Sequence, residues 1–127
     1  MKEHVKEWID KAEEDLFTCN LFIQQEYFPP AQACFHAQQC AEKYLKAFII
    51  HINGDIDKTH DLVKLLDSNI IPSDKDFSEI RKDAQDITDY GVFTRYPGAS
   101  GNIDIEDAKE AIEKAIIIKE FILSKIK

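Results

Sequence analysis

Apolar residues recur at steps of three and four along the first part of the chain, and charged residues fill most positions between them. This spacing places the apolar side chains on one face of a helix. The pattern starts at Val5 and ends at Ile23. The turn that follows, Glu26-Tyr27-Phe28-Pro29-Pro30, contains two prolines, which favour extended backbone before them and a helix start after them. We therefore expect a long amphipathic helix that ends before this turn.

A second helical pattern runs over about residues 31–52 and ends at Asn53-Gly54-Asp55. Its main apolar arc is wide. The opposite side is polar apart from Phe35, Ile49 and Ile50, which suggest a second buried surface. Either an identical chain covers this surface in an isologous homodimer, or other helices of the same chain cover it.

The second half of the chain predicts three more helices. Thr59 precedes a cluster of apolar residues and is expected to be the N-cap of a short helix, with His60 in its first turn. A fourth helix is expected to end near Tyr90-Gly91, and Asp104 is expected to cap the last helix. No segment alternates with period two, so the expected fold is all-α, an up-and-down four-helix bundle with an additional short helix.

Length and charge limit the possible functions. At 127 residues the chain is expected to form one domain, residues 1–127. Its formal net charge of −8 disfavours non-specific binding to nucleic-acid backbones, which depends on clustered basic side chains. The apolar runs are too short to span a membrane, and the N-terminus enters a charged amphipathic segment directly, so we expect a cytoplasmic protein.

The cysteines and histidines do not indicate a metal site or a cofactor. Cys19, Cys34 and Cys40 are odd in number, lie on expected helices and lack C-x-x-C spacing. Buried reduced thiols are the expected state, because free cysteine behaves as a small hydrophobic residue. The four histidines have no metal-ligand spacing either.

Residues 91–103 contain a single charged side chain, Arg95, although 31% of the whole chain is charged. A guanidinium group can grip a phosphate through two hydrogen bonds, and the neighbouring Phe93 or Tyr96 offers a ring for base stacking. Arg95 and Tyr96 are therefore candidates for an anion-binding site. The alternative is a structural ion pair that fixes the loop. Its candidate partners are Glu42, Asp15, Asp61 and Asp89.

The polar side of the second helix contributes further candidates. Glu42 and Lys46 stand four residues apart, and on an exposed surface such a pair stabilises a helix by only about 0.2–0.5 kcal/mol. In the functional interpretation they line a groove with Gln39 that faces Arg95, and Lys46 supplies a second cation for phosphate. His60 either packs the start of the short helix or joins this site.

Four segments together resemble one known family. They are Asp15-Leu16, Gln39-Cys40-Ala41-Glu42-Lys43-Tyr44-Leu45-Lys46-Ala47, Thr59-His60-Asp61-Leu62 and Arg95-Tyr96-Pro97. In this order they resemble the prokaryotic HEPN domain of the nucleotidyltransferase-associated type, over nearly the whole chain. The resemblance implies a helical bundle, frequent homodimers and partnership with a minimal nucleotidyltransferase, in some cases as a toxin–antitoxin pair.

The resemblance also implies either nucleotide binding or metal-independent RNA cleavage. RNA-cleaving members carry a histidine roughly four to six residues after the arginine, because the histidine can move the 2′-hydroxyl proton while the arginine stabilises phosphate charge. Here Ser100 and Gly101 stand at those distances from Arg95, and the last histidine of the chain is His60.

We therefore expect no catalytic residue. The predicted function is that of a non-catalytic, dimeric HEPN-like binding module that engages a nucleotide, a minimal nucleotidyltransferase or both. The alternatives are a metal-independent RNA-cleaving HEPN toxin and a purely structural interaction protein.

Overall fold

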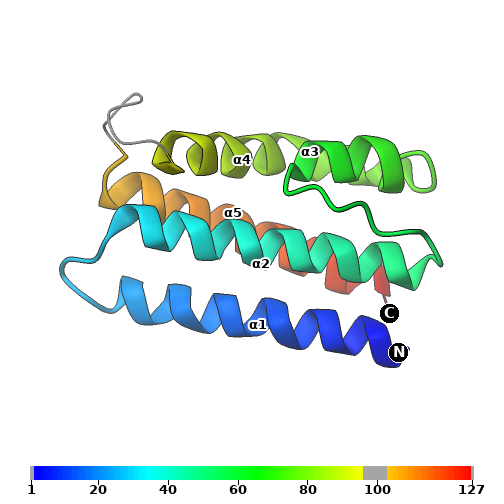
Figure 1. The fold of residues 1–127 in the computed structure, drawn as a ribbon, viewed down its shortest axis with the longest axis horizontal. Helices are drawn as coiled ribbons and strands as arrows, with labels where there is room; N and C mark the ends of the chain where they lie inside the picture. Colours follow the sequence, from blue (N-terminus) through cyan, green and yellow to red (C-terminus); the bar gives the residue numbers. More distant parts are fainter. Residues whose placement is uncertain (1, 96–102, 127) are drawn as a thin grey trace.

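The computed structural model describes residues 2–95 and 103–126, with the backbone alone at residues 92–95 (Figure 1). The four long helices run alternately up and down, and no strand occurs in this part of the chain. The predicted all-α up-and-down bundle is therefore confirmed. Its elements are α1 (Glu3–Ile23), α2 (Pro30–His51), α3 (Leu62–Leu65), a π-helical turn η1 (Leu66–Ile70), a 3₁₀ turn η2 (Lys75–Ile80), α4 (Arg81–Arg95) and α5 (Ile105–Ile126).

Helix α2 is the centre of the bundle, because it packs against α1, α5 and α4 (Figure 1). Its second half is buried on almost every side, and this includes Glu42 and Lys46, which the sequence pattern assigns to a polar face. Ile49 is fully buried and Ile50 half-buried, so the chain itself covers this part of the expected second surface. Phe35, near the start of α2, is exposed.

Two helix ends match the sequence prediction. Asn53 adopts a left-handed conformation (φ 62°) after α2, and the Gly54 amide donates to the Ile49 carbonyl at 2.8 Å, which closes the helix. Asp104 caps α5 through reciprocal bonds with Asp107, whose amide donates to Asp104 Oδ1 at 2.8 Å. Both ends are set by short polar or glycine-containing segments that the sequence reveals directly.

The predicted N-cap of α3 is wrong by two residues. Asp61 caps this helix, because its carboxylate accepts from the Val63 and Lys64 amides at 3.0 and 3.2 Å. Thr59 instead accepts a hydrogen bond from the Asp61 amide at 3.1 Å, which forms a local turn before the cap. His60 therefore lies before α3 and not in its first turn.

The predicted end of α4 is also wrong, because the helix continues past Gly91 to Arg95. Gly91 is buried inside the helix, where a Cβ atom would lie 2.0 Å from Gln38 Oε1 on α2. The glycine therefore permits close approach of two helices and does not mark a helix end. In the described ranges, no helix is long and apolar enough to cross a membrane.

Candidate functional site

A cluster of three charged or ionisable side chains lies where α2 meets the segment before α3. Glu42 is 4% exposed, and its two carboxylate oxygens have different partners. Lys46 Nζ donates to Oε2 at 2.9 Å, and His60 Nδ1 lies 3.0 Å from Oε1. We call Glu42, Lys46 and His60 the Glu42 cluster. It unites three of the candidates taken from the sequence.

His60 is held from two directions. Its ring is bound by Glu42, and its backbone carbonyl accepts from Gln38 Nε2 at 3.0 Å. Because a carboxylate can only accept, Nδ1 is the donor in the ring contact, which leaves Nε2 on the opposite edge of the imidazole. The His60 side chain is 63% exposed, and Nε2 has no partner among the described residues. The cluster therefore presents one oriented imidazole edge to solvent.

Lys46 is the buried cation of the cluster. It is 7% exposed, and its ammonium group also lies 5.8 Å from the centre of the Trp8 ring. Its charge is neutralised by Glu42, so it is not a second free cation for phosphate in this arrangement. Glu42 and Lys46 are thus a buried pair, and the exposed-surface interpretation of their spacing is wrong.

Gln38, which sequence analysis did not select, contacts the site in place of Gln39. Gln38 is 5% exposed, and it holds the His60 carbonyl. Gln38, Glu42 and Lys46 follow one another at steps of four and therefore share one line along α2. That spacing was the signal that could have found Gln38. Gln39 is half-buried, and no hydrogen bond joins its side chain to the cluster among the described residues.

The two other candidates are only partly covered by the structure. The Arg95 backbone forms the last residue of α4, one helical turn after Gly91, and its side chain lies outside the described residues. Tyr96 lies entirely outside them. Their proposed role at an anion site therefore stays a prediction.

A second cluster with similar chemistry ties α1 to α2. Asp15 is 8% exposed, and it accepts from Lys43 Nζ at 2.7 Å and contacts His36 Nδ1 at 2.9 Å. We call Asp15, His36 and Lys43 the Asp15 cluster. Of this group, Asp15 was expected from the sequence as a candidate ion-pair partner, and Lys43 lies in one of the segments that carry the family resemblance. The signal for the others is their spacing, since His36 and Lys43 are two helical turns apart and therefore lie on one face of α2.

The three cysteines are buried, as predicted, and carry free thiols. Burial raises the pKa of Cys19 and of Cys34 to about 12, and it raises that of Cys40 as well. The thiols are therefore protonated near neutral pH and are poor nucleophiles. No group of three metal-ligating side chains occurs in the part of the chain that the structure describes.

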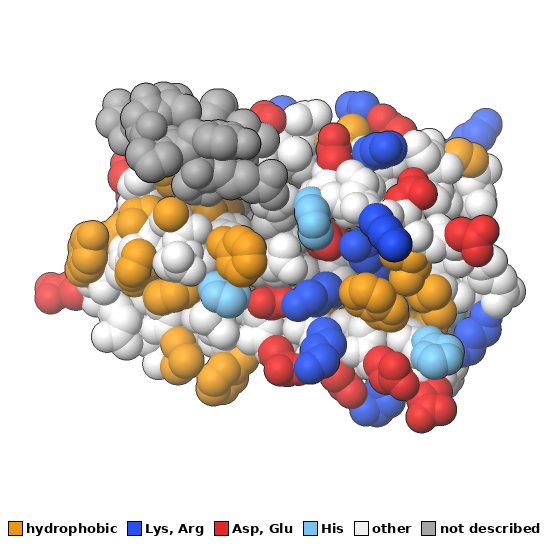
Figure 2. Space-filling view, in the orientation of Figure 1, with side chains coloured by type: hydrophobic (Ala, Val, Ile, Leu, Met, Phe, Trp, Pro, Cys, Tyr) orange, Lys and Arg blue, Asp and Glu red, His pale blue; other side chains and the backbone are white. Residues whose placement is uncertain are grey.

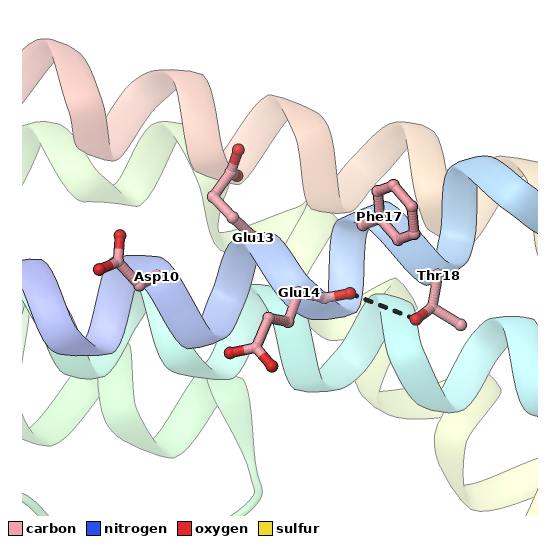
Figure 3. A pocket seen from close by; sticks show the side chains of 5 residues that line it. All are labelled: Asp10, Glu13, Glu14, Phe17 and Thr18. Carbon is pink, nitrogen blue, oxygen red and sulfur yellow. Dashed lines mark hydrogen bonds between the residues drawn. The ribbon is translucent and has the colours of Figure 1, made fainter.

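An acidic depression lies along α1, on the side shown in Figure 3. Asp10, Glu13, Glu14, Phe17 and Thr18 line it, and its volume is about 460 Å³. Thr18 Oγ1 donates to the Glu14 carbonyl at 3.2 Å, so its hydroxyl serves the helix itself. Each of the three carboxylates is paired with a lysine, Asp10 with Lys6, Glu13 with Lys119 and Glu14 with Lys11, so the charged groups that line the depression are used in ion pairs.

Comparison with known proteins identifies the family. The sequence pattern of the HEPN domain matches residues 5–126. The chain belongs to the HEPN domain family. The resemblance carried by the four sequence segments is thereby confirmed.

Two related proteins support this assignment of the HEPN domain. "Putative toxin MJ1304" of Methanocaldococcus jannaschii is 29% identical, and the alignment covers 98% of this chain and 87% of that protein. A crystal structure described as ST0689, an archaeal HEPN homologue, has 26% sequence identity and a TM-score of 0.76 over 100% of both chains. The all-helical fold is therefore shared with a solved member of the family.

Proposed function

We propose that this HEPN domain is a cytoplasmic, homodimeric binding module that engages a nucleotide, a minimal nucleotidyltransferase or both, and does not itself cleave its ligand. The exposed ring of His60, oriented by the buried Glu42 carboxylate, is the observation that carries the proposal. Arg95 and Tyr96 are proposed to supply the phosphate grip and the stacking ring.

The burial of the Glu42 cluster supports a role in binding. A buried ion pair contributes little net stability compared with apolar residues of similar size, because both charges lose their hydration. Glu42 and Lys46 nevertheless lie in the most buried part of α2. The clear effect of this arrangement is that the exposed imidazole of His60 has a fixed orientation. Polar groups that are costly to bury and that orient an exposed group are typical of functional sites.

The residues around Arg95 favour binding over cleavage. The histidine that RNA-cleaving members carry after the arginine is replaced here by uncharged residues, among them Ser100 and Gly101. Without it, the pattern lacks the group that moves the 2′-hydroxyl proton. An arginine and an aromatic ring are sufficient to hold a phosphate and a base, so the remaining residues suit recognition.

Calorimetry with ATP, GTP and a short RNA tests this proposal. His60→Gln is expected to weaken binding about tenfold, which corresponds to about 1.4 kcal/mol. Arg95→Lys is expected to weaken it markedly with little change in melting temperature, because a point charge does not reproduce the planar guanidinium fork. His4→Gln is the matched control, since the exposed His4 ring also lies near a carboxylate, Glu7, at 3.6 Å.

If all three variants bound the ligand with the affinity of the wild type, the proposed site would be rejected. Absence of heat with every ligand, together with retention of a coexpressed nucleotidyltransferase, would restrict the domain to partner binding. If the wild-type domain bound neither a nucleotide nor a nucleotidyltransferase, it would be a purely structural interaction protein.

RNA cleavage is a second candidate, and the geometry of His60 favours it. A histidine whose Nδ1 is bound by a buried carboxylate can accept a proton at Nε2. If His60 replaces the missing histidine, the purified protein cleaves RNA in the presence of EDTA, and His60→Gln abolishes the cleavage. Intact RNA after incubation with the wild-type domain would exclude this candidate.

A further inference from the structure

A groove with an apolar lining lies between α5 and the segment formed by η2 and the start of α4. Its volume is about 500 Å³, and we call it the α4–α5 groove. Ile117 of α5 is 49% exposed, and Phe121, one helical turn later, is half-buried. The apolar residues that line the groove are Ile80, Ile116, Ile117 and Phe121. Apolar grooves between helices are docking sites for amphipathic segments in many complexes.

Carboxylates lie on both sides of this apolar lining. Glu79 and Asp83 stand four residues apart on one side, and Glu120 of α5 stands on the other. Glu79 and Glu120 are exposed, and their side chains form no ion pair or hydrogen bond within the described residues. No basic residue belongs to the lining in this part of the chain. The groove thus keeps two carboxylate charges that its own chain does not neutralise.

Two lysines contact the lining, and both are already neutralised by other carboxylates. Lys114 Nζ lies 3.5 Å from Asp83 and 3.1 Å from Asp86. Lys125 Nζ lies 5.7 Å from the centre of the Phe121 ring, and two carboxylates bind it at 3.0 and 2.7 Å. Neither lysine therefore compensates the charge of Glu79 or Glu120.

The depression along α1 shows that free carboxylates are not general on this surface. It has a similar volume, about 460 Å³, but each of its three carboxylates is paired with a lysine. Figure 2 shows acidic and basic side chains intermingled over the right-hand half of one face of the molecule. The unpaired carboxylates of the α4–α5 groove therefore favour a positively charged partner. A second copy of the groove would bring like charges together.

The shape of the groove fits a helix. Ile117 and Phe121 are four residues apart, as are Glu79 and Asp83, so apolar and acidic rows both follow the helix axes. Because α4 and α5 are neighbouring antiparallel helices, the groove between them can receive a third helix along their length (Figure 1). A lysine or arginine of that helix would cover the apolar lining with its aliphatic stem and reach a carboxylate with its charged head.

We propose that the α4–α5 groove binds a positively charged amphipathic helix of another protein. This goes beyond the proposed function, because the groove lies at the other end of α4 from Arg95. Asp83 and Arg95 are twelve residues apart in that helix, a distance of about 18 Å along its axis. A helical partner and a ligand at Arg95 therefore occupy separate places.

Fluorescence anisotropy with a labelled peptide and the full chain tests the proposal. The probe is an amphipathic peptide of about 18 residues, with leucine on one helical face and lysine on the other. Its counterpart carries glutamate in place of lysine. The lysine peptide is expected to bind and the glutamate peptide is not. The double variant Glu79→Gln with Glu120→Gln is expected to raise the dissociation constant about tenfold, and Ile117→Gln about threefold.

The matched control removes the same amount of charge elsewhere. Glu3 and Glu26 are exposed and, like Glu79 and Glu120, form no side-chain ion pair among the described residues. The double variant Glu3→Gln with Glu26→Gln is expected to change the dissociation constant less than about twofold, because only the overall attraction decreases. Circular dichroism checks that all variants stay folded.

Backbone amide NMR locates the peptide. Shifts centred on residues 79–83 and 116–121, together with the selective loss in the groove variants, support the proposal. Equal losses in both double variants, shifts centred on α1, or an unchanged affinity of Ile117→Gln would overturn it. Spermidine carries positive charge without an apolar face, so spermidine binding as tight as that of the peptide would also overturn a helical partner.

Two further measurements separate this inference from the other proposals. Calorimetry with ATP and GTP on the Glu79→Gln and Glu120→Gln double variant is expected to match the wild type, and a wild type that binds no nucleotide leaves the peptide result standing. Sedimentation equilibrium of Ile117→Gln examines self-association. If this substitution abolished a dimer, a second copy would occupy the groove, and the proposal would be overturned.

Discussion

The Asp15 cluster and the Glu42 cluster are built from the same three groups. Each has one buried carboxylate that binds a lysine ammonium with one oxygen and an imidazole Nδ1 with the other. They differ in which component reaches solvent. In the Asp15 cluster His36 and Lys43 are both about one quarter exposed, whereas in the Glu42 cluster the lysine is buried and the histidine is 63% exposed.

This difference in exposure indicates a structural contact at the Asp15 cluster and a candidate binding site at the Glu42 cluster. His36 belongs to α2, contacts the Phe22 and Phe35 rings and joins α2 to α1 through Asp15. His60 belongs to the segment before α3, its side chain is 63% exposed, and its Nε2 makes no hydrogen bond within the described residues. The same three groups therefore join two helices in one place and orient a solvent-exposed ring in the other.

Removing the carboxylates is expected to have the largest effect and to distinguish the clusters. Glu42→Ala strands the buried Lys46 ammonium and is expected to lower the free energy of unfolding by about 3–5 kcal/mol. Asp15→Ala leaves two partners that can reach water and is expected to cost about 1–3 kcal/mol. Urea unfolding of both variants measures the difference, and equal losses would show that burial of the lysine does not separate the clusters.

Removing the histidines is expected to reverse this order, so that the Asp15 cluster variant loses more stability than the Glu42 cluster variant. His36→Ala deletes a ring that contacts two aromatic side chains and binds Asp15, and it is expected to lower the free energy of unfolding by about 1–3 kcal/mol. His60→Ala removes a mostly exposed ring and is expected to change it by about 0.5 kcal/mol or less. Thermal and urea unfolding provide the measurement. A loss for His60→Ala that exceeds that for His36→Ala would assign His60 a structural role.

Replacing the buried pair by apolar residues is expected to have a smaller effect than removing one partner. The double variant Glu42→Leu with Lys46→Met is expected to stay within about 1 kcal/mol of the wild type, because neither charge remains to be desolvated. Ligand binding through His60 is expected to be lost, since the ring is no longer oriented. Unfolding and calorimetry on one preparation give both values, and retained binding would show that Glu42 does not position His60.

The exposed ion pair of Asp67 and Arg81 is the baseline, because its removal is expected to have the smallest effect on stability. Two hydrogen bonds from Arg81 lower the pKa of Asp67 from its ordinary value, and both side chains are more than 40% exposed. Because the folded-state pKa is depressed, the contribution is present above the pKa of the unfolded chain and is lost as pH falls through the folded-state pKa. It is small because solvent screens the pair.

Carboxyl NMR titration checks this baseline. In Arg81→Gln the Asp67 pKa is expected to rise to its ordinary value, while stability near neutral pH changes little. An unchanged Asp67 pKa in this variant would mean that Arg81 does not cause the shift.

Most of the fold follows from the sequence, because amphipathic periodicity is a local signal. The ends of α1 and α2 and the cap at Asp104 depend on residues next to them in the chain, and these predictions are confirmed. The end of α4 could not be predicted in this way. From the neighbouring residues alone, Gly91 suggests a helix end. Its contact with Gln38 on α2 explains why a glycine lies inside α4.

The candidate site was predicted only in part, because contacts between different elements are not contained in a local sequence pattern. Glu42, Lys46 and His60 were selected from the sequence, but their mutual contacts depend on the path of the chain between α2 and α3. The polar side of α2 appears exposed on a helical projection. It is buried because α4 and the segment before α3 cover it, and a single-helix pattern does not contain that information.

The packing of Gly91 on Gln38 links two parts of the molecule that are far apart in sequence. The amide of Gln38 lies against α4, which ends at Arg95, and also holds the carbonyl of His60. One side chain of α2 thus lies against both segments. A methyl group added at position 91 would displace the Gln38 amide, and with it the hydrogen bond that this amide donates to the His60 carbonyl.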